Sequence, residues 1–331
     1  MSTTIFDVAR ITGFSKTTIS RAFSSPEQVS EKTRNIIYAA AKKVNYTPNA
    51  IARAMVKKKT DNIAFVVSDQ QYPVVLNPFY SPIFEGVLQM GREKGYSVFI
   101  ASDGDIKLST GQVYMKKQMD GVIVCGQTDL ATIESFRFQN IPVVVLNNIF
   151  DVDELLCVTV DHYGGTVSAV EHLIDKGHSD IAIISGHFSP YVYNQRYQGF
   201  IDTLKKHNIP LKEEYIKEVE PTVSDAMACT QELLQLKNPP SAIFATNDVI
   251  AIGAMKVAMR NKLLIPDDLA IVGFDDSNFS AMIEPPLTTV RIAKEELGKL
   301  AASKLIEIIE GKPHPKEIIE CATQLIERGT T

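Results

Sequence analysis

The sequence predicts an all-α N-terminal head followed by an α/β body that consists of two doubly wound, parallel-sheet subdomains. Three observations lead to this fold class. The first 45 residues carry short apolar stripes at helical spacing, separated by polar residues and glycine. From residue 61 onward, strand-sized apolar runs alternate with amphipathic helical windows, which is typical of sheets buried on both faces. This alternation starts again near residue 161, so two similar subdomains are favoured over one large sheet.

The head is expected to contain three short helices. The first, IFDVARIT at 5–12, follows Thr4 as an N-cap and ends at Gly13. The second, KTTISRAF, follows Ser15, and the third, within SEKTRNIIYAAAKKVN, begins at Ser30. Two helices joined by a three- to four-residue turn with glycine form the helix-turn-helix pattern. We therefore predict a helix-turn-helix head.

Ten apolar runs are expected to form the strands of the body. In the first half they are NIAFVVS (62–68), YSVFIAS (96–102), GVIVC (121–125), IPVVVLN (141–147) and CVTVD (157–161). In the second half they are DIAIISG (180–186), YIKEVE (215–220), SAIFATND (241–248), LAIVGFDD (269–276) and LTTVRI (287–292). Windows such as PIFEGVLQMGREKG and YGGTVSAVEHLIDKG lie between them and are expected to be helices.

Several classes of protein are disfavoured by composition. The longest apolar runs are strand-sized, far short of the roughly 20 residues that cross a bilayer, and MSTTIFDVAR has no secretion-signal pattern, so no membrane association is expected. The four cysteines (125, 157, 229 and 321) lack C-x-x-C spacing and are interpreted as small core residues of a reduced cytoplasm. No G-x-S-x-G motif, phosphate loop or metal-binding histidine spacing occurs, so no enzyme activity, cofactor or metal is expected.

Charge is distributed unevenly along the chain. Residues 1–60 contain eleven basic and three acidic side chains, a net charge of +8, whereas the remainder contains 23 basic and 36 acidic side chains. A basic module on an acidic body is typical of a protein that binds a polyanion through one end. The head is therefore expected to bind nucleic acid.

The second head helix carries the residues suited to contacting bases. In a helix-turn-helix the N-terminal part of this helix enters the major groove, and here it presents Lys16, Thr17 and Arg21. Arg and Lys suit guanine O6 and N7, and Thr can bond a base edge or touch a thymine methyl group. Hydroxyl side chains at helix starts and flanks are candidates for phosphate contacts: Thr4, Ser15, Thr18, Ser30 and Thr33. The alternative is an ordinary solvated helix face.

The sequence resembles the lactose/galactose repressor (LacI/GalR) family of transcriptional regulators over almost its whole length. IFDVARITGFSKTTISRAF followed by VSEKTRNIIYAAAKKVNYTPNAIARAM resembles the family's DNA-binding head, with Thr12 and Phe14 at positions that usually hold Ala and Val. The body landmarks occur in the family's order: GVLQMGREKGYSV, QMDGVIV, VEHLIDKGHSDIAIISG, NQRYQGF, ATNDVIAIGAM, LAIVGFDD and EPPLTTVRI. The resemblance implies a periplasmic-binding-protein-like body, a palindromic double-stranded operator, and a bacterial cytoplasmic protein that joins the nucleoid when bound to DNA.

The resemblance also implies how the chain is divided. It places a helix-turn-helix domain at 1–48 and a hinge helix with linker at 49–60. The N-terminal subdomain of the effector-binding core would comprise 61–161 with 291–321, and the C-terminal subdomain 162–290 with 322–331. Because no heptad repeat follows the last body strand, a homodimer is expected rather than a tetramer.

The hinge helix would contact the minor groove at the operator centre. By resemblance the contacting residues are Asn49, Ala52 and Met55, with Met55 where family members usually carry Leu. Methionine is among the apolar side chains that can wedge a base step. The run Lys57–Lys59 is interpreted as a basic linker.

A small-molecule site is expected where the strands of the two subdomains end. Carboxylates and amides follow several strands, including Asn147, Asn247 and Asp275, and aromatic residues lie in the same loops. These side chains suit a sugar or similar polar ligand, although each alone could be a helix cap or turn residue. The resemblance narrows the effector-binding set to Phe79, Tyr80, Asp161, Arg196, Asn247 and Asp275.

Lys294 leaves two alternatives for the effector's charge. Some family members place a stacking aromatic residue at this position, so a lysine here is compatible with an anionic effector such as a sugar phosphate. The alternative is a lysine that points outward into solvent.

Three functions are compatible with such a body. The first is a repressor whose operator affinity is controlled by a small-molecule effector, a sugar or sugar derivative. A solute-binding protein of the periplasmic type would have a similar body, but the missing signal sequence and the basic head disfavour it. A sugar-modifying enzyme is disfavoured because no catalytic constellation is present.

Overall fold

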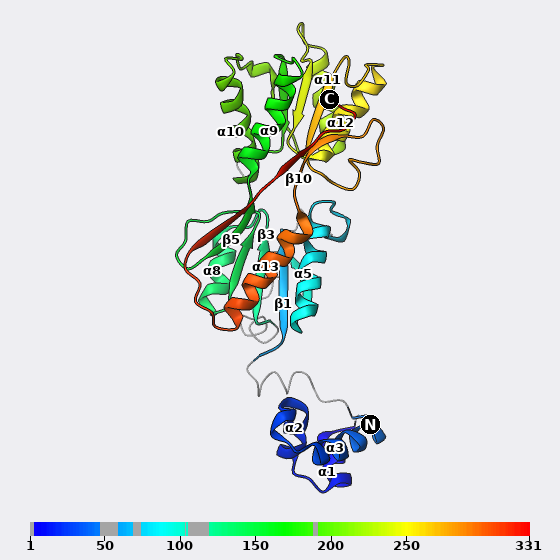
Figure 1. The fold of residues 1–331 in the computed structure, drawn as a ribbon, viewed down its shortest axis with the longest axis vertical. Helices are drawn as coiled ribbons and strands as arrows, with labels where there is room; N and C mark the ends of the chain where they lie inside the picture. Colours follow the sequence, from blue (N-terminus) through cyan, green and yellow to red (C-terminus); the bar gives the residue numbers. More distant parts are fainter. Residues whose placement is uncertain (1–2, 47–58, 69–73, 103, 105–118, 188–190) are drawn as a thin grey trace. The chain divides into compact units, whose positions relative to one another are not determined.

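The computed structural model describes residues 3–46, 59–68, 74–102, 104, 119–187 and 191–331 (Figure 1). The chain forms two compact units, Met1–Asn62 with Gly111–Asp120 and Ile63–Thr110 with Gly121–Thr331. The first unit contains the helical head, and the second contains the α/β body.

The head is a small three-helix unit with its own core. It contains α1 (Ile5–Thr12), α2 (Lys16–Ser24), the 3₁₀ turn η1 (Pro26–Gln28) and α3 (Glu31–Lys43). Gly13 ends α1 in the left-handed conformation, with φ of 71°, and its N–H donates to Ala9 O at 2.9 Å. The fully buried side chains come from all three helices: Val8, Ile19, Ala22 and Ile37. All three predicted head helices are confirmed.

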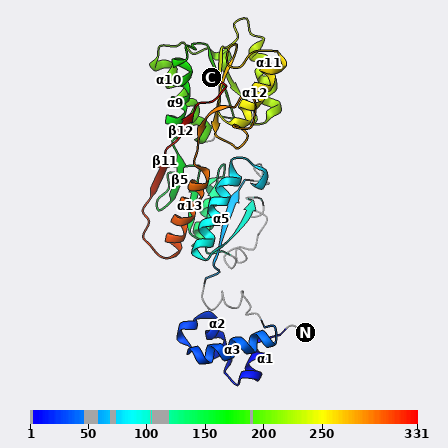
Figure 2. The same cartoon turned by 45° about the vertical axis from the view of Figure 1, so that its right-hand side comes forward.

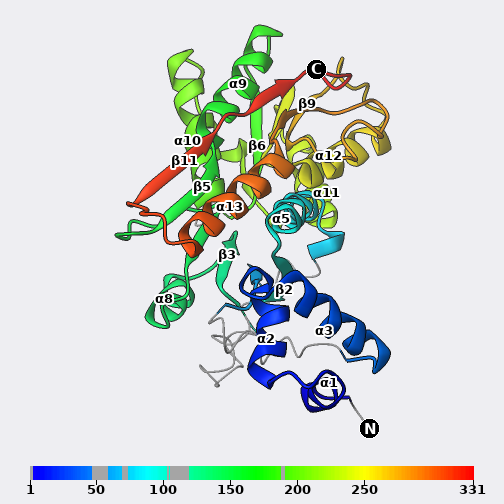
Figure 3. The same cartoon turned by 60° about the horizontal axis from the view of Figure 1, so that its bottom comes forward.

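The first body subdomain is built on a six-stranded sheet in the order β11-β5-β4-β3-β1-β2. Its strands are β1 (Asn62–Val67), β2 (Ser97–Ser102), β3 (Gly121–Cys125), β4 (Val143–Leu146), β5 (Leu156–Val160) and β11 (Glu317–Cys321). Its other elements are η3 (Val74–Leu76), α5 (Tyr80–Lys94), α8 (Leu130–Phe138) and α13 (Lys294–Ile309). Helices α5 and α13 lie side by side (Figure 3). They approach so closely that a Cβ on Gly86 would lie 2.0 Å from Glu295 O.

The second body subdomain repeats this plan with the order β12-β10-β9-β8-β6-β7. Its strands are β6 (Ile181–Ser185), β7 (Ile216–Glu218), β8 (Ala242–Ala245), β9 (Ala270–Asp275), β10 (Thr288–Arg291) and β12 (Gln324–Ile326). Its other elements are α9 (His162–Asp175), α10 (Tyr191–Lys206), η4 (Glu213–Tyr215), α11 (Val223–Leu234) and α12 (Asp248–Arg260). Strand β12 runs antiparallel to β10, and the remaining pairings are parallel.

The chain crosses between the two subdomains three times (Figures 1 and 2). The crossings lie between β5 and α9, between β10 and α13, and between β11 and β12. His162 is consequently the first residue of α9 in the second subdomain, directly after the first crossing. Lys294 is the first residue of α13 in the first subdomain, directly after the second crossing.

All ten predicted body strands are confirmed, but β11 and β12 were not predicted from their sequences. Both lie at sheet edges, and exposed residues interrupt their apolar pattern, as in EIIEC at 317–321. The cysteine interpretation holds for Cys125, Cys157 and Cys229, which are buried, whereas Cys321 is partly exposed. No helix in the described part of the chain is both long and apolar enough to cross a membrane.

Candidate functional site

Helix α2 has one face in the head core and an opposite face in solvent. Ile19 and Ala22 are fully buried, whereas Lys16, Thr17 and Arg21 are exposed. The Lys16 ammonium lies 3.7 Å from the centroid of the Phe6 ring on α1, which holds its flexible side chain against that helix. Two cations and a hydroxyl therefore share the solvent face of the second helix of the motif.

The hydroxyl residues at the helix starts form local caps. Ser15 Oγ accepts from Thr18 N at 3.1 Å, and Ser30 Oγ accepts from Thr33 N at 3.3 Å. Thr4 donates its N–H and its hydroxyl to Asp7 Oδ2, both at 3.0 Å, and these hydrogen bonds lower the pKa of Asp7. The caps fix the helix N-termini, whose free N–H groups are suited to phosphate oxygens.

The two departures from the family pattern in the head have local explanations. Thr12 donates its hydroxyl to Val8 O at 2.8 Å, and it accepts from Phe14 N at 3.4 Å, which closes the turn between α1 and α2. The Phe14 ring packs against the head core. The predicted hinge residues Asn49, Ala52 and Met55 lie outside the described residues.

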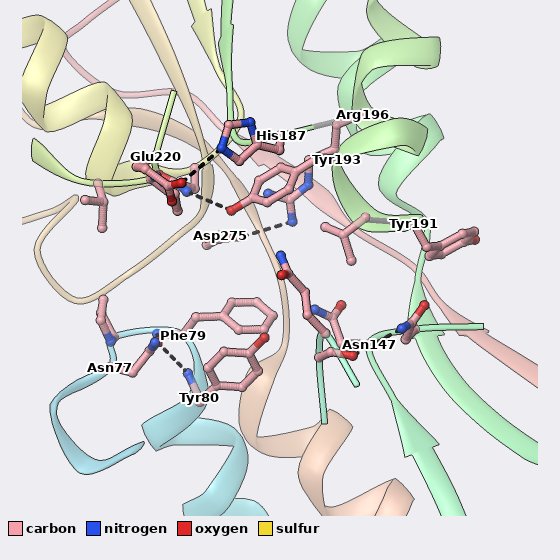
Figure 4. A pocket seen from close by; sticks show the side chains of 18 of the residues that line it. Asn77, Phe79, Tyr80, Asn147, His187, Tyr191, Tyr193, Arg196, Glu220 and Asp275 are labelled. Carbon is pink, nitrogen blue, oxygen red and sulfur yellow. Dashed lines mark hydrogen bonds and ion pairs between the residues drawn. The ribbon is translucent and has the colours of Figure 1, made fainter. Parts of the chain in front are cut away.

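The body contains a cavity of about 620 Å³ between its two subdomains (Figure 4). Residues from the first subdomain that line it are Asn77, Pro78, Phe79, Tyr80, Gly126, Gln127, Asn147 and Asn148. Residues from the second are His187, Tyr191, Val192, Tyr193, Arg196, Glu220, Pro221, Thr222, Asn247, Val249 and Asp275. Sugar-sized ligands fit cavities of this size, which lie at the carboxyl ends of parallel strands in such folds.

Arg196 is the centre of the wall formed by the second subdomain. It projects from α10 and is 2% exposed, with its guanidinium carbon 3.7 Å from the centroid of the Phe274 ring. Its Nη2 donates to Asp275 Oδ1 at 3.1 Å, and its Nη1 donates to the carbonyl of Thr246. The charge is therefore paired, and the side chain is held in one orientation.

A third partner of Arg196 is the buried ring of His162. Arg196 Nη2 and Nε lie 3.2 and 3.3 Å from His162 Nδ1, and His162 Nε2 lies 3.1 Å from Asn147 Oδ1. Because a guanidinium can only donate, Nδ1 must accept, which places the ring proton on Nε2 and directs it to Asn147. Burial and the nearby Arg196 charge hold the pKa of His162 well below its usual value, which is consistent with this neutral tautomer.

Asp275 occupies an unusual backbone position at the end of β9. Its φ is 110° and that of Asp276 is 46°, so two consecutive non-glycine residues adopt positive φ angles, at a cost of about 1–2 kcal/mol each. This conformation directs the Asp275 carboxylate to Arg196 at the cavity (Figure 4). Burial raises the pKa of Asp275, and the neighbouring cations Arg196 and Lys294 oppose that rise.

Asn247 combines a helix cap with a position in the cavity wall. Its Oδ1 accepts from Ile250 N at 2.8 Å and so caps α12, and its Nδ2 lies 3.4 Å from the Tyr193 hydroxyl. The adjacent Asp248 is buried and accepts from Ser277 N and Thr289 Oγ1, both at 2.6 Å. Burial and the charge of Asp275 raise the pKa of Asp248 to about 7.

The wall formed by the first subdomain consists of aromatic rings and amides. Asn77 Oδ1 accepts from the backbone N–H groups of Phe79 and Tyr80 at 3.0 and 3.1 Å, which fixes the start of α5. The two rings lie edge to face with their centroids 5.0 Å apart (Figure 4). Asn148 Nδ2 donates to Gly126 O at 3.1 Å. Flat apolar faces beside amides can hold the two faces and the hydroxyls of a sugar ring.

Two residues singled out from the sequence do not line the cavity. Lys294 is not outward-pointing: it is 8% exposed, and its Nζ donates to the carbonyls of Asp275 and Asp276, so it does not line the cavity. Asp161 also does not line the cavity in the described structure. Its Oδ1 instead accepts from Gly164 N at 2.6 Å and caps α9. The structure brings together the other five predicted effector residues: Phe79, Tyr80, Arg196, Asn247 and Asp275.

Sequence reasoning missed several residues of the site. Asn77, Gln127, His187 and Glu220 line the cavity, and His162 supports it from behind. A hydrogen bond from His187 to Glu220 at 3.0 Å raises the pKa of His187. Only Asn77 had a sequence signal, because an asparagine shortly before a helical window is a possible cap. In the described residues no cluster of histidine, cysteine or acidic side chains could hold a metal ion.

Comparisons with known proteins agree with this architecture. Residues 4–49 match the family described as bacterial regulatory proteins, lacI family, and residues 170–331 match the periplasmic binding protein-like domain. The probable HTH-type transcriptional repressor ExuR of Bacillus subtilis is 34% identical over 96% of this chain and 95% of its own. The HTH-type transcriptional repressor PurR of Mannheimia succiniciproducens is 31% identical over 98% of this chain and 97% of its own.

Solved structures with the same fold include a ligand-bound transcriptional regulator and an operator-bound repressor. The transcriptional regulator CelR–cellobiose complex superposes with a TM-score of 0.76 at 27% identity, covering 99% of this chain and 100% of the other. The lac repressor dimer bound to operator and the anti-inducer ONPF superposes with a TM-score of 0.86 at 25% identity, covering 100% of this chain and 99% of the other. This chain belongs to the lacI family of bacterial regulatory proteins.

Proposed function

We propose that this chain is a non-enzymatic transcription repressor that binds a palindromic operator as a homodimer. A small polyhydroxylated effector in the body cavity raises or lowers its affinity for the operator. The observation that carries the proposal is the joint presence of an exposed Lys16–Thr17–Arg21 face on α2 and a polar cavity between two α/β subdomains. An effector can change operator affinity only by its difference in affinity for two states of the body.

The head residues have separate proposed roles. Lys16, Thr17 and Arg21 contact base edges, and the capping residues Thr4, Ser15, Thr18, Ser30 and Thr33 contact phosphates. Selection of binding sites from random duplexes by the full chain should enrich a two-fold symmetric sequence. Enrichment of an asymmetric sequence would contradict the palindromic operator and the homodimer.

A gel shift on the selected operator tests the base contacts. The double variant Lys16→Ala/Arg21→Ala should lose operator affinity by about 1–3 kcal/mol per side chain and lose discrimination against scrambled DNA. A double variant with the same loss of charge, Lys42→Ala/Lys43→Ala at the exposed end of α3, should reduce binding to both DNAs alike. Equal discrimination in all three proteins would refute the proposed base contacts.

The effector is proposed to be a sugar or sugar derivative bound by Phe79, Tyr80, Arg196, Asn247 and Asp275. Lys294 gave the sequence-based reason for an anionic effector, and its Nζ is occupied by two backbone carbonyls instead. We therefore expect neutral sugars to raise the melting temperature more than their phosphate esters or nucleobases in a thermal-shift screen. Asp275→Ala should abolish the shift, and a greater shift with the phosphate esters would overturn the neutral class.

The hinge is proposed to form on operator DNA, with Asn49, Ala52 and Met55 facing the minor groove. A helix this short is below the roughly 12–15 residues at which isolated helices are stable, so DNA would be needed to order it. Met55→Ala should weaken operator binding and leave effector binding unchanged, as measured by gel shift and calorimetry. Unchanged operator affinity would reduce the segment to a tether.

A further inference from the structure

Lys294 is a buried cation whose ammonium donates hydrogen bonds to the other body subdomain. It begins α13, which packs on α5 in the first subdomain, while its Nζ donates to the backbone carbonyls of Asp275 and Asp276 at the end of β9 in the second. The distance to Asp276 O is 3.0 Å, and the residue is 8% exposed. A lysine is rarely buried to this degree unless its charge is compensated and its donors are used.

The turn that Lys294 binds is firmly attached to the second subdomain by other contacts. Asp276 Oδ2 accepts from Arg291 Nε, and its Oδ1 accepts from Arg328 Nη2, both at 2.6 Å. Arg328 also donates to Leu287 O at 2.7 Å. The two positive φ angles in this turn leave both carbonyls pointing at the Lys294 ammonium. A displacement of α13 would therefore act on a rigid turn.

The same turn carries a side chain of the cavity. Asp275 pairs with Arg196 at 3.1 Å, so the residue that presents a carboxylate to the site also presents its carbonyl to Lys294. On the other side, α13 lies against α5, whose first residue is Tyr80 in the opposite wall. Lys294 thus connects the two walls through one short chain of contacts.

We propose that Lys294 is a positioning residue. Its hydrogen bonds to the Asp275 and Asp276 carbonyls, here called the latch, hold the first subdomain to the second and so set the spacing of the two cavity walls. The inference goes beyond effector binding and operator binding, because the latch exists in the free protein. The alternative is that Lys294 only compensates the negative charge of the neighbouring acids. It would then stabilise the protein without controlling the spacing of the subdomains. The experiment must therefore measure spacing as well as stability.

The test is a spin-label distance measurement on the full chain without ligand or DNA. Labels are attached to Glu93→Cys on α5 and Lys237→Cys after α11, both exposed positions. A Cys321→Ser background removes the partly exposed thiol, and the other three cysteines are buried. The Lys294→Met variant should broaden the distance distribution and shift it, whereas Lys294→Arg, which keeps the charge and donors, should keep the wild-type distribution. Lys299→Met on the same helix is the matched control and should resemble the wild type.

The outcomes are separable from those that test the proposed function. A distribution unchanged in a folded Lys294→Met protein, or one broadened equally by Lys299→Met, would overturn the latch. If thermal unfolding shows that Lys294→Met does not fold, Lys294→Ala, which removes the charge and every donor and leaves room for water beside the two carbonyls, is measured in its place. Broadening there supports the latch and an unchanged distribution overturns it. None of these readouts depends on an operator or an effector, so a failed repressor assay leaves them standing.

Discussion

The two walls of the cavity are constructed differently, although both come from the same doubly wound plan. In the second subdomain the polar groups bond to each other before any ligand arrives: Asp275, Arg196 and His162 form a buried hydrogen-bonded row. In the first subdomain Phe79 and Tyr80 pack edge to face beside the hydrophobic core, and Asn77 accepts hydrogen bonds from their backbone N–H groups. One wall is a preorganised polar network, and the other is an apolar surface with amides.

This difference predicts where substitutions lower stability most and where part of their effect is confined to binding. Removing one member of the buried network leaves its partner without compensation, which costs free energy in the ligand-free protein. Removing an aromatic face at the cavity wall leaves no charge unpaired, so its cost in stability should be smaller than that of a broken buried pair, and part of the loss should appear only in the complex. Effector affinities below refer to the sugar that gives the largest thermal shift.

The largest effect is expected from Arg196→Met. The variant leaves the Asp275 carboxylate buried without its ion-pair partner, and breaking a buried pair in this way costs about 3–5 kcal/mol of unfolding free energy. Effector binding should be lost as well, as measured by calorimetry. The double variant Arg196→Met/Asp275→Asn removes the stranded charge and should regain stability without regaining binding. A double variant no more stable than Arg196→Met would contradict the account of this wall.

The next effect concerns Asp248, which lies beside this network. The pKa of Asp248 is raised from 3.8 to about 7 in the folded protein. Between pH 3.8 and pH 7 the folded state therefore keeps a proton on this carboxyl, whereas the unfolded state has released it. Asp248 therefore makes stability fall as pH rises toward 7, by roughly 2–3 kcal/mol between pH 5 and pH 8. Asp248→Asn should remove this loss in denaturant unfolding at a series of pH values. A variant with the wild-type pH dependence would show that Asp248 is ionised throughout.

His162 should produce the opposite slope. Its pKa is depressed in the folded protein, so below the ordinary value of 6.5 the unfolded state takes up a proton that the folded state does not. Stability is therefore fully present above pH 6.5 and is lost on acidification, at a limiting slope of about 1.4 kcal/mol per pH unit. His162→Asn should remove this loss of unfolding free energy on acidification. The opposite pH dependence of Asp248 should then be seen alone in the same pH range. His178→Asn is the control, because His178 is only half-buried and should contribute less.

The residues that line the cavity and the residues that support it from behind differ in how far they could be predicted from the sequence. Phe79, Tyr80, Asn247 and Asp275 follow or precede predicted strands and helices, so the rule that ligands bind at strand ends brings them together. His162 and Lys294 begin helices directly after chain crossings, and their partners lie far away in sequence: Asn147 and Arg196 for one, the 275–276 turn for the other. Such contacts depend on which subdomain a helix joins after the crossing, which periodicity does not specify.

Asp161 is assigned to the site by resemblance, and Lys294 is singled out because it departs from the family pattern. Both show that the position of a residue in the sequence does not give the direction of its side chain. The Asp161 carboxylate accepts a hydrogen bond from a backbone N–H of its own helix, and the Lys294 ammonium donates to two backbone carbonyls. Both assignments depended on the direction of a side chain, which follows from the hydrogen bonds available nearby and not from the position in a motif. The prediction of the overall fold does not depend on any one side chain, because it rests on many strands and helices.

The smallest effect is expected from Phe79→Leu in the other wall. Leucine keeps most of the apolar volume but loses the flat ring that packs edge-on against Tyr80 with 5.0 Å between centroids. Loss of the pair with Tyr80 should lower the unfolding free energy by about 1 kcal/mol, well below the loss expected for Arg196→Met. Loss of the flat ring face that the effector would contact should lower effector affinity roughly fivefold. Calorimetry and denaturant unfolding measure the two quantities on the same protein. If Phe79→Leu instead lowered stability as much as Arg196→Met, the aromatic wall would belong to the preorganised structure, and the distinction between the two walls would be wrong.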